Sequence, residues 1–197
     1  MKEDILEQLV TDYLEVKGYF TTANVKFRPD SSSEGYNPRQ DSVHSDIDVL
    51  GFHPLKSGSD RVVAVSCKSL QEGFDPKWEL NAIERNRIVG GRDAWRRYRE
   101  LANAKWAQAF RATVIAKTGV EQFTYITAVT HVIGDKSVWE QCAQFRLNIG
   151  CEIRVLTLHE MFREVLASLT GTTVANSELG RTIQLFRAAG ITLSAGA

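Results

Sequence analysis

The amino-acid sequence predicts an α/β fold in which helices flank a mixed β-sheet. Three observations favour this class: an amphipathic helical pattern opens the chain, three β-branched and aromatic segments follow it, and helical and strand-like segments then alternate. The 197 residues are 43% hydrophobic and 24% charged, which is ordinary for a globular protein. We therefore expect one main domain over residues 1–170 and a linker with a helical appendage over residues 171–197.

Each expected element has a local signal. The first helix places its apolar residues on one side and stops at Gly18, and Pro76 suits the first turn of a later helix. The stretch 30–44, rich in Ser, Asp, Asn, Gly and Pro, is expected to form a long loop. In the first part of the chain we expect a helix at 5–16 and strands at 19–27, 46–52 and 61–69, of which the last two form a hairpin. A helical region should follow from 76 to 117, broken at Gly90 and Gly91. The remainder should alternate as a strand at 122–133, a helix at 137–148, a strand at 152–158, a helix at 158–169, and a last helix that follows the 170–177 linker and ends at Gly190.

Composition excludes several classes of protein. Three cysteines without a CxxC pair and four scattered histidines argue against a disulfide framework and against a structural zinc site. The 24 basic and 24 acidic residues cancel, so overall charge carries no nucleic-acid signature. No apolar run approaches the length of a membrane span, and the first residues lack the apolar core of a signal peptide, so we expect a cytoplasmic protein without membrane contact.

The most informative residue is Asp48, which lies in an otherwise apolar strand. Alternation along the strand predicts that Asp46 and Asp48 share one face, while Ile47 and Val49 share the other. A carboxylate in such a strand is costly unless it is paired, hydrogen-bonded or bound to a metal. We therefore expect a polar partner for Asp48 on the neighbouring strand.

That partner is predicted to be the segment Ser66-Cys67-Lys68. Ser66 and Lys68 share a face of their strand, and pairing with the preceding strand brings Asp48 beside them. Cys67 points to the opposite face, so we interpret it as a buried core residue rather than a nucleophile. A plain salt bridge at the strand edge is the alternative interpretation of Asp48 and Lys68.

These segments resemble the PD-(D/E)XK nuclease superfamily, which includes restriction endonucleases and archaeal Holliday-junction resolvases. Glu7 is similar to the glutamate of the family's first helix, Asp48 in Ile-Asp-Val-Leu-Gly to its metal-binding aspartate, and Val-Ser-Cys-Lys to the (D/E)-x-K tripeptide. The order of elements from Leu6 to Leu169 also agrees. The resemblance implies a restriction-endonuclease-like core with the order helix, three strands, helix, strand, helix, strand, and with helices on both faces.

The resemblance also implies a chemistry. Glu7, Asp48, Ser66 and Lys68 would be the catalytic residues of a Mg²⁺- or Mn²⁺-dependent enzyme that hydrolyses DNA, with Asp48, Glu7 and Asp46 as candidate metal ligands. Magnesium takes one or two carboxylates from a protein and keeps several waters, and it neutralises charge that develops on a phosphate. Lys68 would hold the attacking water or the scissile phosphate as a point charge.

Ser66 departs from the family pattern, because the motif has Asp or Glu at this position. A hydroxyl is a neutral and weak magnesium ligand, so the predicted site lacks one negative charge. Asp46 could complete the set, or one of three later acids could be relocated into the site: Glu72, Glu79 and Glu84. Failing both, the chain would be a catalytically inactive DNA- or protein-binding module.

A basic stretch follows these segments. Between Arg85 and Lys117 nine basic residues outnumber two acidic ones. Seven of them are predicted to contact DNA phosphates: Arg85, Arg87, Arg92, Arg96, Arg97, Arg99 and Lys105. Alternatively, the interleaved aromatic residues form a core face of a helix and the arginines are simply solvated on its other face.

Two further hypotheses concern other partners. A nucleotide-binding domain is disfavoured, because no glycine-rich phosphate loop follows a strand. The last helix is either an amphipathic docking element or, more simply, packs on its own domain. Because cutting both strands of a duplex usually takes two active centres, a homodimer or a partner protein is an open alternative to a monomer.

Overall fold

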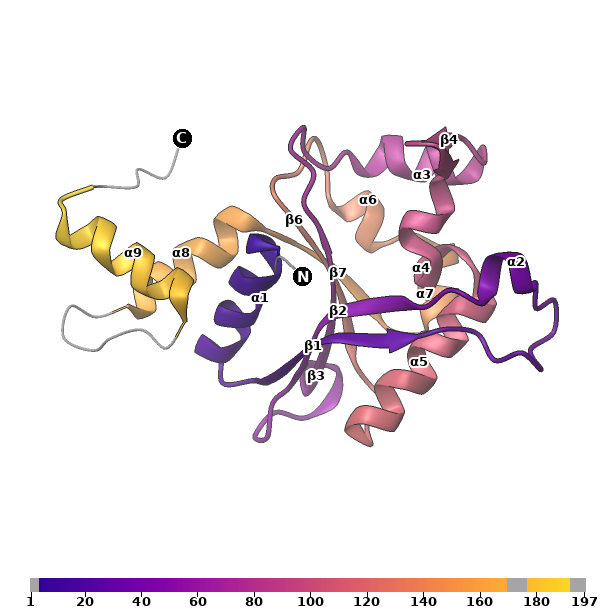
Figure 1. The fold of residues 1–197 in the computed structure, drawn as a ribbon, viewed down its shortest axis with the longest axis horizontal. Helices are drawn as coiled ribbons and strands as arrows, with labels where there is room; N and C mark the ends of the chain where they lie inside the picture. The colour runs from indigo at the N-terminus through magenta and orange to yellow at the C-terminus, as the bar shows by residue number, and fades with distance from the viewer. Residues whose placement is uncertain (1–3, 170–176, 192–197) are drawn as a thin grey trace.

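The computed structural model describes residues 4–169 and 177–191. Its main sheet contains five strands, which are β1 (Phe20–Phe27), β2 (Ser45–Phe52), β3 (Val62–Lys68), β6 (Thr124–Val129) and β7 (Glu152–Thr157). They lie in the order β1-β2-β3-β6-β7 (Figure 1). β1, β2 and β3 pair antiparallel, whereas β3, β6 and β7 pair parallel. The predicted mixed sheet is therefore confirmed.

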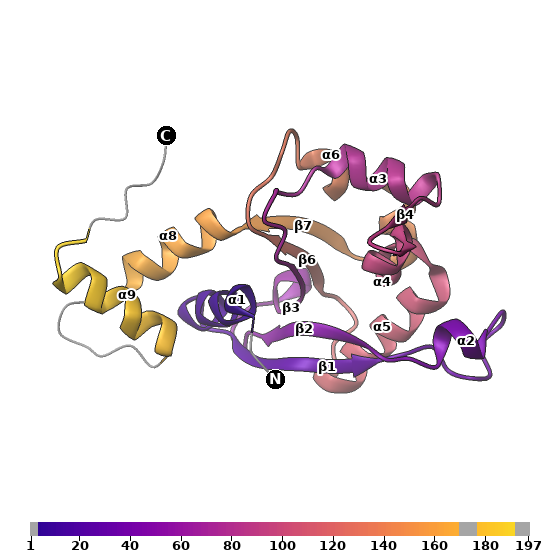
Figure 2. The ribbon, with the colours of Figure 1, turned by 45° about the horizontal axis from the view of Figure 1, so that its top comes forward.

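Helices cover both faces of this sheet (Figure 1 and Figure 2). One face carries α3 (Pro76–Glu84), α4 (Arg99–Ala102), α5 (Ala104–Thr118), α6 (Ser137–Glu140) and α7 (Ala143–Ile149). The other face carries α1 (Ile5–Val16), α8 (Leu158–Ser168) and α9 (Glu178–Ala188). The parallel pairs need such crossover helices, because parallel strands cannot be joined by a tight turn.

Each face has its own core. Aromatic rings dominate the core beneath α4 and α5, where Tyr98, Trp106, Phe110, Tyr125 and Trp139 are at most 1% exposed. Several of these rings meet edge to face, as Phe74 and Trp139 do at 5.0 Å between centroids. The core beneath α1 and α8 is mainly aliphatic. The core in which a strand residue packs therefore shows to which face of the sheet its side chain points.

The helical region predicted from 92 to 117 is divided into three pieces. They are the 3-10 helix η2 (Ala94–Tyr98), α4 and α5. The peptide at Asn103 is extended, with φ −132° and ψ 122°, which ends α4 and begins α5. Gly90 and Gly91 both have positive φ, at 58° and 77°, and they form the turn of a small hairpin between β4 (Ile88–Val89) and β5 (Arg92–Asp93).

Two other segments also differ from expectation. The helix predicted over 137–148 is two short helices, α6 and α7, with Gln141 and Cys142 between them. The predicted loop 30–44 contains a single helical turn, α2 (Pro38–Asp41), in which Asn37 caps the first turn and Pro38 occupies its first position. The turn before β3 contains the 3-10 helix η1 (Gly58–Asp60).

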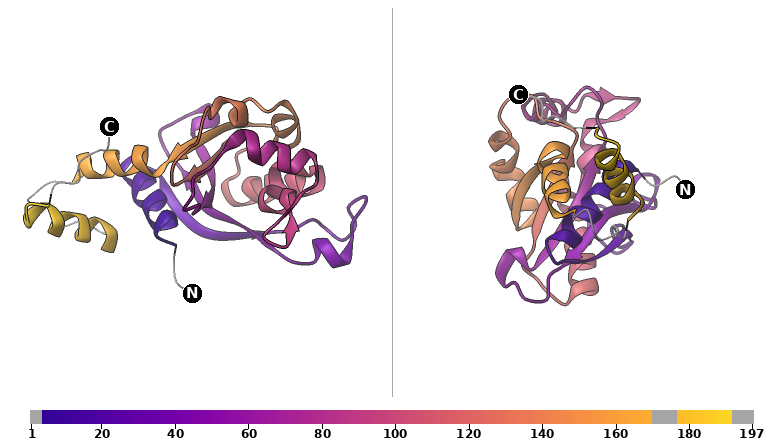
Figure 3. Two further views of the ribbon diagram at one scale, coloured as in Figure 1. Left: turned by 90° about the horizontal axis from the view of Figure 1, so that it is seen from above. Right: turned by 90° about the vertical axis from the view of Figure 1, so that its left-hand side faces the viewer.

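The last helix packs on the same domain. α9 contacts α1 and α8, and its Ile183 is only 2% exposed in their core. Ser177 caps α9 and also donates a hydrogen bond of 2.6 Å to the Asp12 carboxylate of α1. Seen from above, α8 and α9 extend from one end of the molecule (Figure 3). Most of the predicted linker 170–177 and the tail beyond 191 lie outside the described residues.

Among the described residues, no helix has the length and apolar character needed to cross a lipid bilayer.

Candidate active site

β2 and β3 separate at Asp48. Their pairing runs from Phe52 opposite Val62 to Val49 opposite Val65, and it ends there. On the other side of β2, Asn24 of β1 has a φ of 56°, a left-handed conformation that Asn tolerates better than most residues. Regular pairing on both sides of Asp48 is therefore interrupted.

This interruption corrects one prediction. Ile47 and Val49 do not share a face, because Ile47 packs in the aromatic core and Val49 in the aliphatic one. The alternation of a strand requires a regular backbone, and the backbone is irregular between these two residues. Asp46 instead lies within 3.5 Å of Lys26 on β1, although it remains close enough to affect the pKa of Asp48.

The Asp48 carboxylate is held by the neighbouring strand. Its Oδ2 atom accepts a hydrogen bond of 2.6 Å from the backbone N–H of Cys67. Burial raises the pKa of Asp48 above its ordinary value, and the Glu100 and Asp46 carboxylates raise it further, while Lys68 and the Cys67 N–H act in the opposite direction. The pKa of Asp48 is raised overall, so a further positive charge beside this carboxylate would stabilise its ionised form.

Ser66 and Lys68 lie on the same face of β3, as predicted. The Nζ atom of Lys68 donates a hydrogen bond of 2.9 Å to Oγ of Ser66, and it lies 5.6 Å from the centre of the Tyr98 ring. Ser66 is 4% exposed. The ammonium of Lys68 therefore sits at the edge of the aromatic core, beside Asp48.

Cys67 points to the other side of the sheet, also as predicted. It packs with the aliphatic core, and burial, followed by the Asp48 and Glu7 carboxylates, raises the pKa of its thiol far above the ordinary value. Such a thiol remains protonated near neutral pH and is a poor nucleophile.

Glu7 is half-buried on α1, which covers the aliphatic face of the sheet. The charges of Glu7, Asp48 and Lys68 all act on the Cys67 thiol. The structure thus brings Asp48, Ser66 and Lys68 together, and Glu7 reaches the neighbourhood of Cys67 from the helix on the aliphatic face.

The residue that sequence reasoning missed is Glu100 on α4. Its side chain is 4% exposed, and its Oε1 accepts a hydrogen bond of 2.6 Å from the phenol of Tyr125. Tyr125 lies on β6 directly beside β3, and Ser66 is close enough to its phenol to lower the pKa of that group. Burial, and then the Glu100 carboxylate, raise the pKa of Tyr125 well above its ordinary value, so the phenol remains a donor. Glu100, Tyr125, Ser66 and Lys68 therefore form one connected polar cluster beside Asp48.

The three acids proposed for relocation lie elsewhere. Glu79 is buried, but Arg97 holds its Oε1 at 2.9 Å. Glu72 and Glu84 are exposed. Glu100 is among the main groups that shift the pKa of Asp48, and none of these three acids is. In the sequence, Glu100 stands out only as one of two acids within a basic stretch, and its closeness to Tyr125 depends on the fold.

The donor set of this cluster is compatible with a hard divalent cation. Asp48 and Glu100 provide carboxylate oxygens, and Ser66 provides a neutral hydroxyl. Over residues 4–169 and 177–191, no three His, Cys, Asp or Glu side chains gather closely enough to enclose a metal ion. Two carboxylates nevertheless suit Mg²⁺, which takes one or two carboxylates from a protein and keeps several waters in its coordination shell.

Comparisons with known proteins add no identification. No family model matches the chain, and no curated protein and no solved structure is significantly similar to it.

The seven predicted DNA-contact residues fall into two groups. Arg96 is ion-paired with Asp93 at 3.0 Å, Arg97 with Glu79, and Lys105 with the buried Asp41 at 2.5 Å. Arg85, Arg87 and Arg92 are exposed, and Arg99 is half-buried. The aromatic residues of this stretch form the core, as the alternative interpretation holds, so only part of the basic set is available to a ligand.

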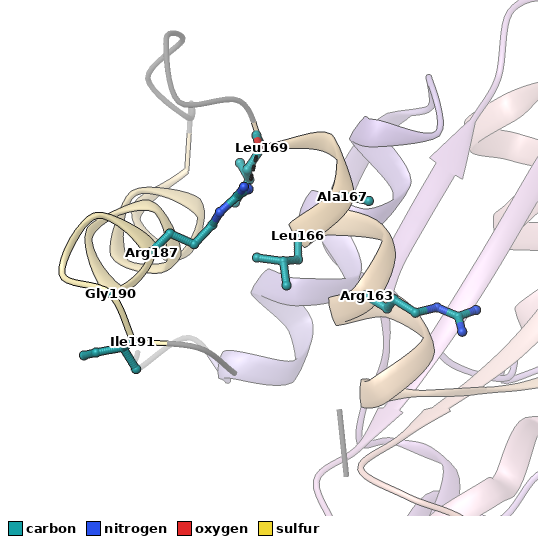
Figure 4. A pocket seen from close by; sticks show the side chains of 7 residues that line it. All are labelled: Arg163, Leu166, Ala167, Leu169, Arg187, Gly190 and Ile191. Atoms are coloured by element: carbon teal, nitrogen blue, oxygen red, sulfur yellow. Dashed lines mark hydrogen bonds between the residues drawn. The ribbon is translucent and has the colours of Figure 1, made fainter. Parts of the chain in front are cut away.

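A separate cavity of about 610 Å³ lies between α8 and α9 (Figure 4). Leu166, Leu169 and Ile191 line it together with Arg163 and Arg187, and Arg187 donates a hydrogen bond of 2.9 Å to the Leu169 carbonyl. None of its lining residues belongs to the cluster around Asp48. We assign it no role in the candidate site.

Proposed function

We propose that this protein is a Mg²⁺- or Mn²⁺-dependent DNA endonuclease that hydrolyses phosphodiester bonds in restriction or another form of genome defence. The observation that carries the proposal is that Asp48, where β2 and β3 separate, lies within electrostatic reach of both the Glu100 carboxylate and the Lys68 ammonium, which shift its pKa in opposite directions. Carboxylates for a metal and a cation for a phosphate are the groups that phosphodiester hydrolysis requires.

The arrangement of elements supports a restriction-endonuclease-like core. A first helix precedes three antiparallel strands, and two parallel strands with intervening helices follow. This is the order that the resemblance to the PD-(D/E)XK superfamily implies. In the proposal Glu100 replaces the acid that is missing at Ser66.

Each residue would have a distinct task in the reaction. A bound Mg²⁺ would neutralise charge on the scissile phosphate. Asp48 and Glu100 would hold the cation, and the Tyr125 phenol would keep Glu100 in place through its bond of 2.6 Å. Lys68 would orient the attacking water or the phosphate from its position beside Ser66.

A second candidate function is a catalytically inactive module that binds DNA or another protein. It is favoured by Ser66 at a motif position that is normally acidic and by the lack of a three-residue metal-binding group among the described residues. In this alternative Asp48 and Lys68 stabilise the strand ends and bind no metal.

One experiment separates the two functions. The purified full-length chain is incubated with supercoiled plasmid, linear duplex, branched and single-stranded DNA, with Mg²⁺, Mn²⁺ or EDTA. We expect metal-dependent cutting that is abolished in Lys68→Ala, because this change removes the cation that faces the phosphate. Tight binding without cutting of any substrate would support the inactive module, and sedimentation of the DNA complex would show whether two copies assemble.

The role of Glu100 is tested by moving its charge. We expect Glu100→Gln to lower the cleavage rate by roughly 10–100-fold and to raise the Mg²⁺ concentration that gives half-maximal rate. Adding Ser66→Glu to this variant returns a carboxylate to the cluster from β3, so the double variant is expected to recover part of the rate. If Glu100→Gln cleaves at the rate of the unchanged protein, Glu100 is a structural partner of Tyr125 and no metal ligand.

A further inference from the structure

Arg99 lies next to Glu100 on α4 but does not join the cluster around Asp48. Its guanidinium stacks over the Trp106 ring at 4.5 Å, and its Nε donates a hydrogen bond of 3.2 Å to the Arg96 carbonyl. The Nη1 atom of Arg99 is buried and has no hydrogen-bond partner within the described part of the chain. A buried charged donor without an acceptor is costly, so this position favours an external acceptor.

Two other arginines lie close to Arg99 along the chain. The Arg96 carbonyl accepts the hydrogen bond from Arg99 Nε, and Arg92 lies on β5, directly before η2. Arg96 is balanced by Asp93, which accepts from its Nε at 3.0 Å. Arg92 is exposed on β5 and forms no ion pair with another described residue. Of the three cations, only Arg96 therefore has a direct ion pair with another described residue.

We propose that Arg92, Arg96 and Arg99 form a binding site for a phosphate group of a nucleic-acid backbone, beside the candidate active site. Guanidinium groups present planar forks of donors that match phosphate oxygens, and stacking on an aromatic ring holds such a fork in position. The bound phosphate would accept a hydrogen bond from Nη1 of Arg99, and its negative charge would offset the repulsion among the three arginines.

The choice of nucleic acid rests on the proposed nuclease function and on the position of the site. Arg99 and Glu100 are consecutive residues, so the arginine cluster and the candidate metal ligand are attached to the same turn of α4. A strand whose scissile phosphate lies at Asp48 also carries other phosphates nearby. Exposed Arg85 and Arg87 directly precede the β4–β5 hairpin and add two positive charges to this part of the chain.

The site is tested by binding, separately from cleavage. A fluorescein-labelled DNA duplex is titrated with full-length protein that carries Asp48→Ala, in EDTA and over a series of salt concentrations. Adding Arg99→Ala or Arg92→Ala is expected to weaken binding about tenfold at ~0.1 M salt and to lower the slope of log affinity against log salt by about one. Arg99→Lys is expected to recover only part of the affinity, because lysine keeps the charge but loses the fork.

Arg163→Ala is the matched control, since it removes an exposed arginine from α8 on the other side of the sheet. Its affinity and salt slope should stay unchanged. Thermal unfolding of each variant is measured alongside, and exposed Arg92 carries the test if Arg99→Ala unfolds. Unchanged DNA affinity and slope in Arg92→Ala would overturn the proposed site.

Two further probes identify the ligand. Inorganic phosphate and a mononucleotide compete with the labelled duplex, and equal affinity for phosphate and duplex would show a site for a free anion rather than for a backbone. An acidic peptide that binds more tightly than DNA would overturn the proposal as well. Arginine-dependent binding without cleavage would refute the proposed nuclease function and support the phosphate site. Cleavage that is insensitive to substitution of Arg92 and Arg99 would support the nuclease function and refute the phosphate site.

Discussion

Asparagine in place of Asp48 is expected to lower metal-dependent DNA cleavage by at least about a thousandfold, since the reaction loses its central metal ligand. The substitution is nearly isosteric, and the amide oxygen of asparagine can still accept the hydrogen bond from the Cys67 N–H, which is 2.6 Å long in the unchanged chain. The strands should therefore keep their positions while the charge disappears. Single-turnover cleavage of plasmid at saturating protein measures the effect.

Two other aspartates serve as comparisons for this prediction. Asp60 lies on η1 and pairs with Arg154 at the surface, so Asp60→Asn should cleave at the unchanged rate. Asp46→Asn tests the alternative that Asp46 completes the metal site despite its contact with Lys26. A loss in Asp46→Asn as large as in Asp48→Asn would assign Asp46 rather than Glu100 as the second ligand. Full activity of Asp48→Asn in Mg²⁺ would refute the proposed mechanism.

The meeting of Asp48 with Ser66 and Lys68 could be predicted because it depends on short-range rules. Both strands are rich in β-branched residues, and a turn-like segment joins them, so their antiparallel pairing follows from the sequence. Alternation along β3 then correctly places Ser66 and Lys68 on one face and Cys67 on the other. The mixed sheet and its flanking helices follow from the order of elements in the same way.

Glu100 could not be predicted because it depends on contacts between distant elements. The stretch from 92 to 117 has an overall helical pattern, but the extended peptide at Asn103 and the 3-10 helix before α4 change which side chains face the sheet. A regular helix through this stretch would give Glu100 a different direction. Its acceptor role also requires Tyr125, which comes from β6, a strand far along the chain that lies beside β3 through parallel pairing.

The same limitation applies to Asp46 and Lys105. The common face predicted for Asp46 and Asp48 assumes a regular strand, yet β2 loses its pairing with β3 at Asp48 and faces a left-handed Asn24 on β1. Lys105 belongs to a basic stretch, but the fold buries its acidic partner Asp41 from a loop 64 residues earlier. Charge counted along the sequence therefore overestimates the charge available to DNA.

Alanine in place of Asp41 is expected to lower the free energy of unfolding by about 3–5 kcal/mol, because it leaves buried donors without an acceptor. The Asp41 side chain is fully buried, and it accepts hydrogen bonds from Lys105 Nζ at 2.5 Å, Trp106 Nε1 at 3.0 Å and the Asn37 N–H at 2.7 Å. This carboxylate therefore attaches the α2 segment to α5. Urea denaturation followed by tryptophan fluorescence measures the loss, and Asp30→Ala, which removes an exposed acid that caps only Ser32, should change stability far less.

The stability contributed by Asp41 should also depend on pH in a defined direction. Burial alone would raise the pKa of Asp41, but the hydrogen bonds from Lys105, Asn37 and Trp106 outweigh burial, and the pKa is lowered from its ordinary value. A carboxyl group whose pKa is lower in the folded state stabilises the fold above the pKa of the unfolded chain, near ~3.9, and loses this contribution as the pH falls through the folded value. The difference in unfolding free energy between the unchanged chain and Asp41→Asn should thus be constant from neutral pH down to about pH 5 and shrink below about pH 4. A difference that stays constant through this acidic range would show that the charge of Asp41 contributes nothing and that its value to the fold lies in shape and neutral hydrogen bonding alone.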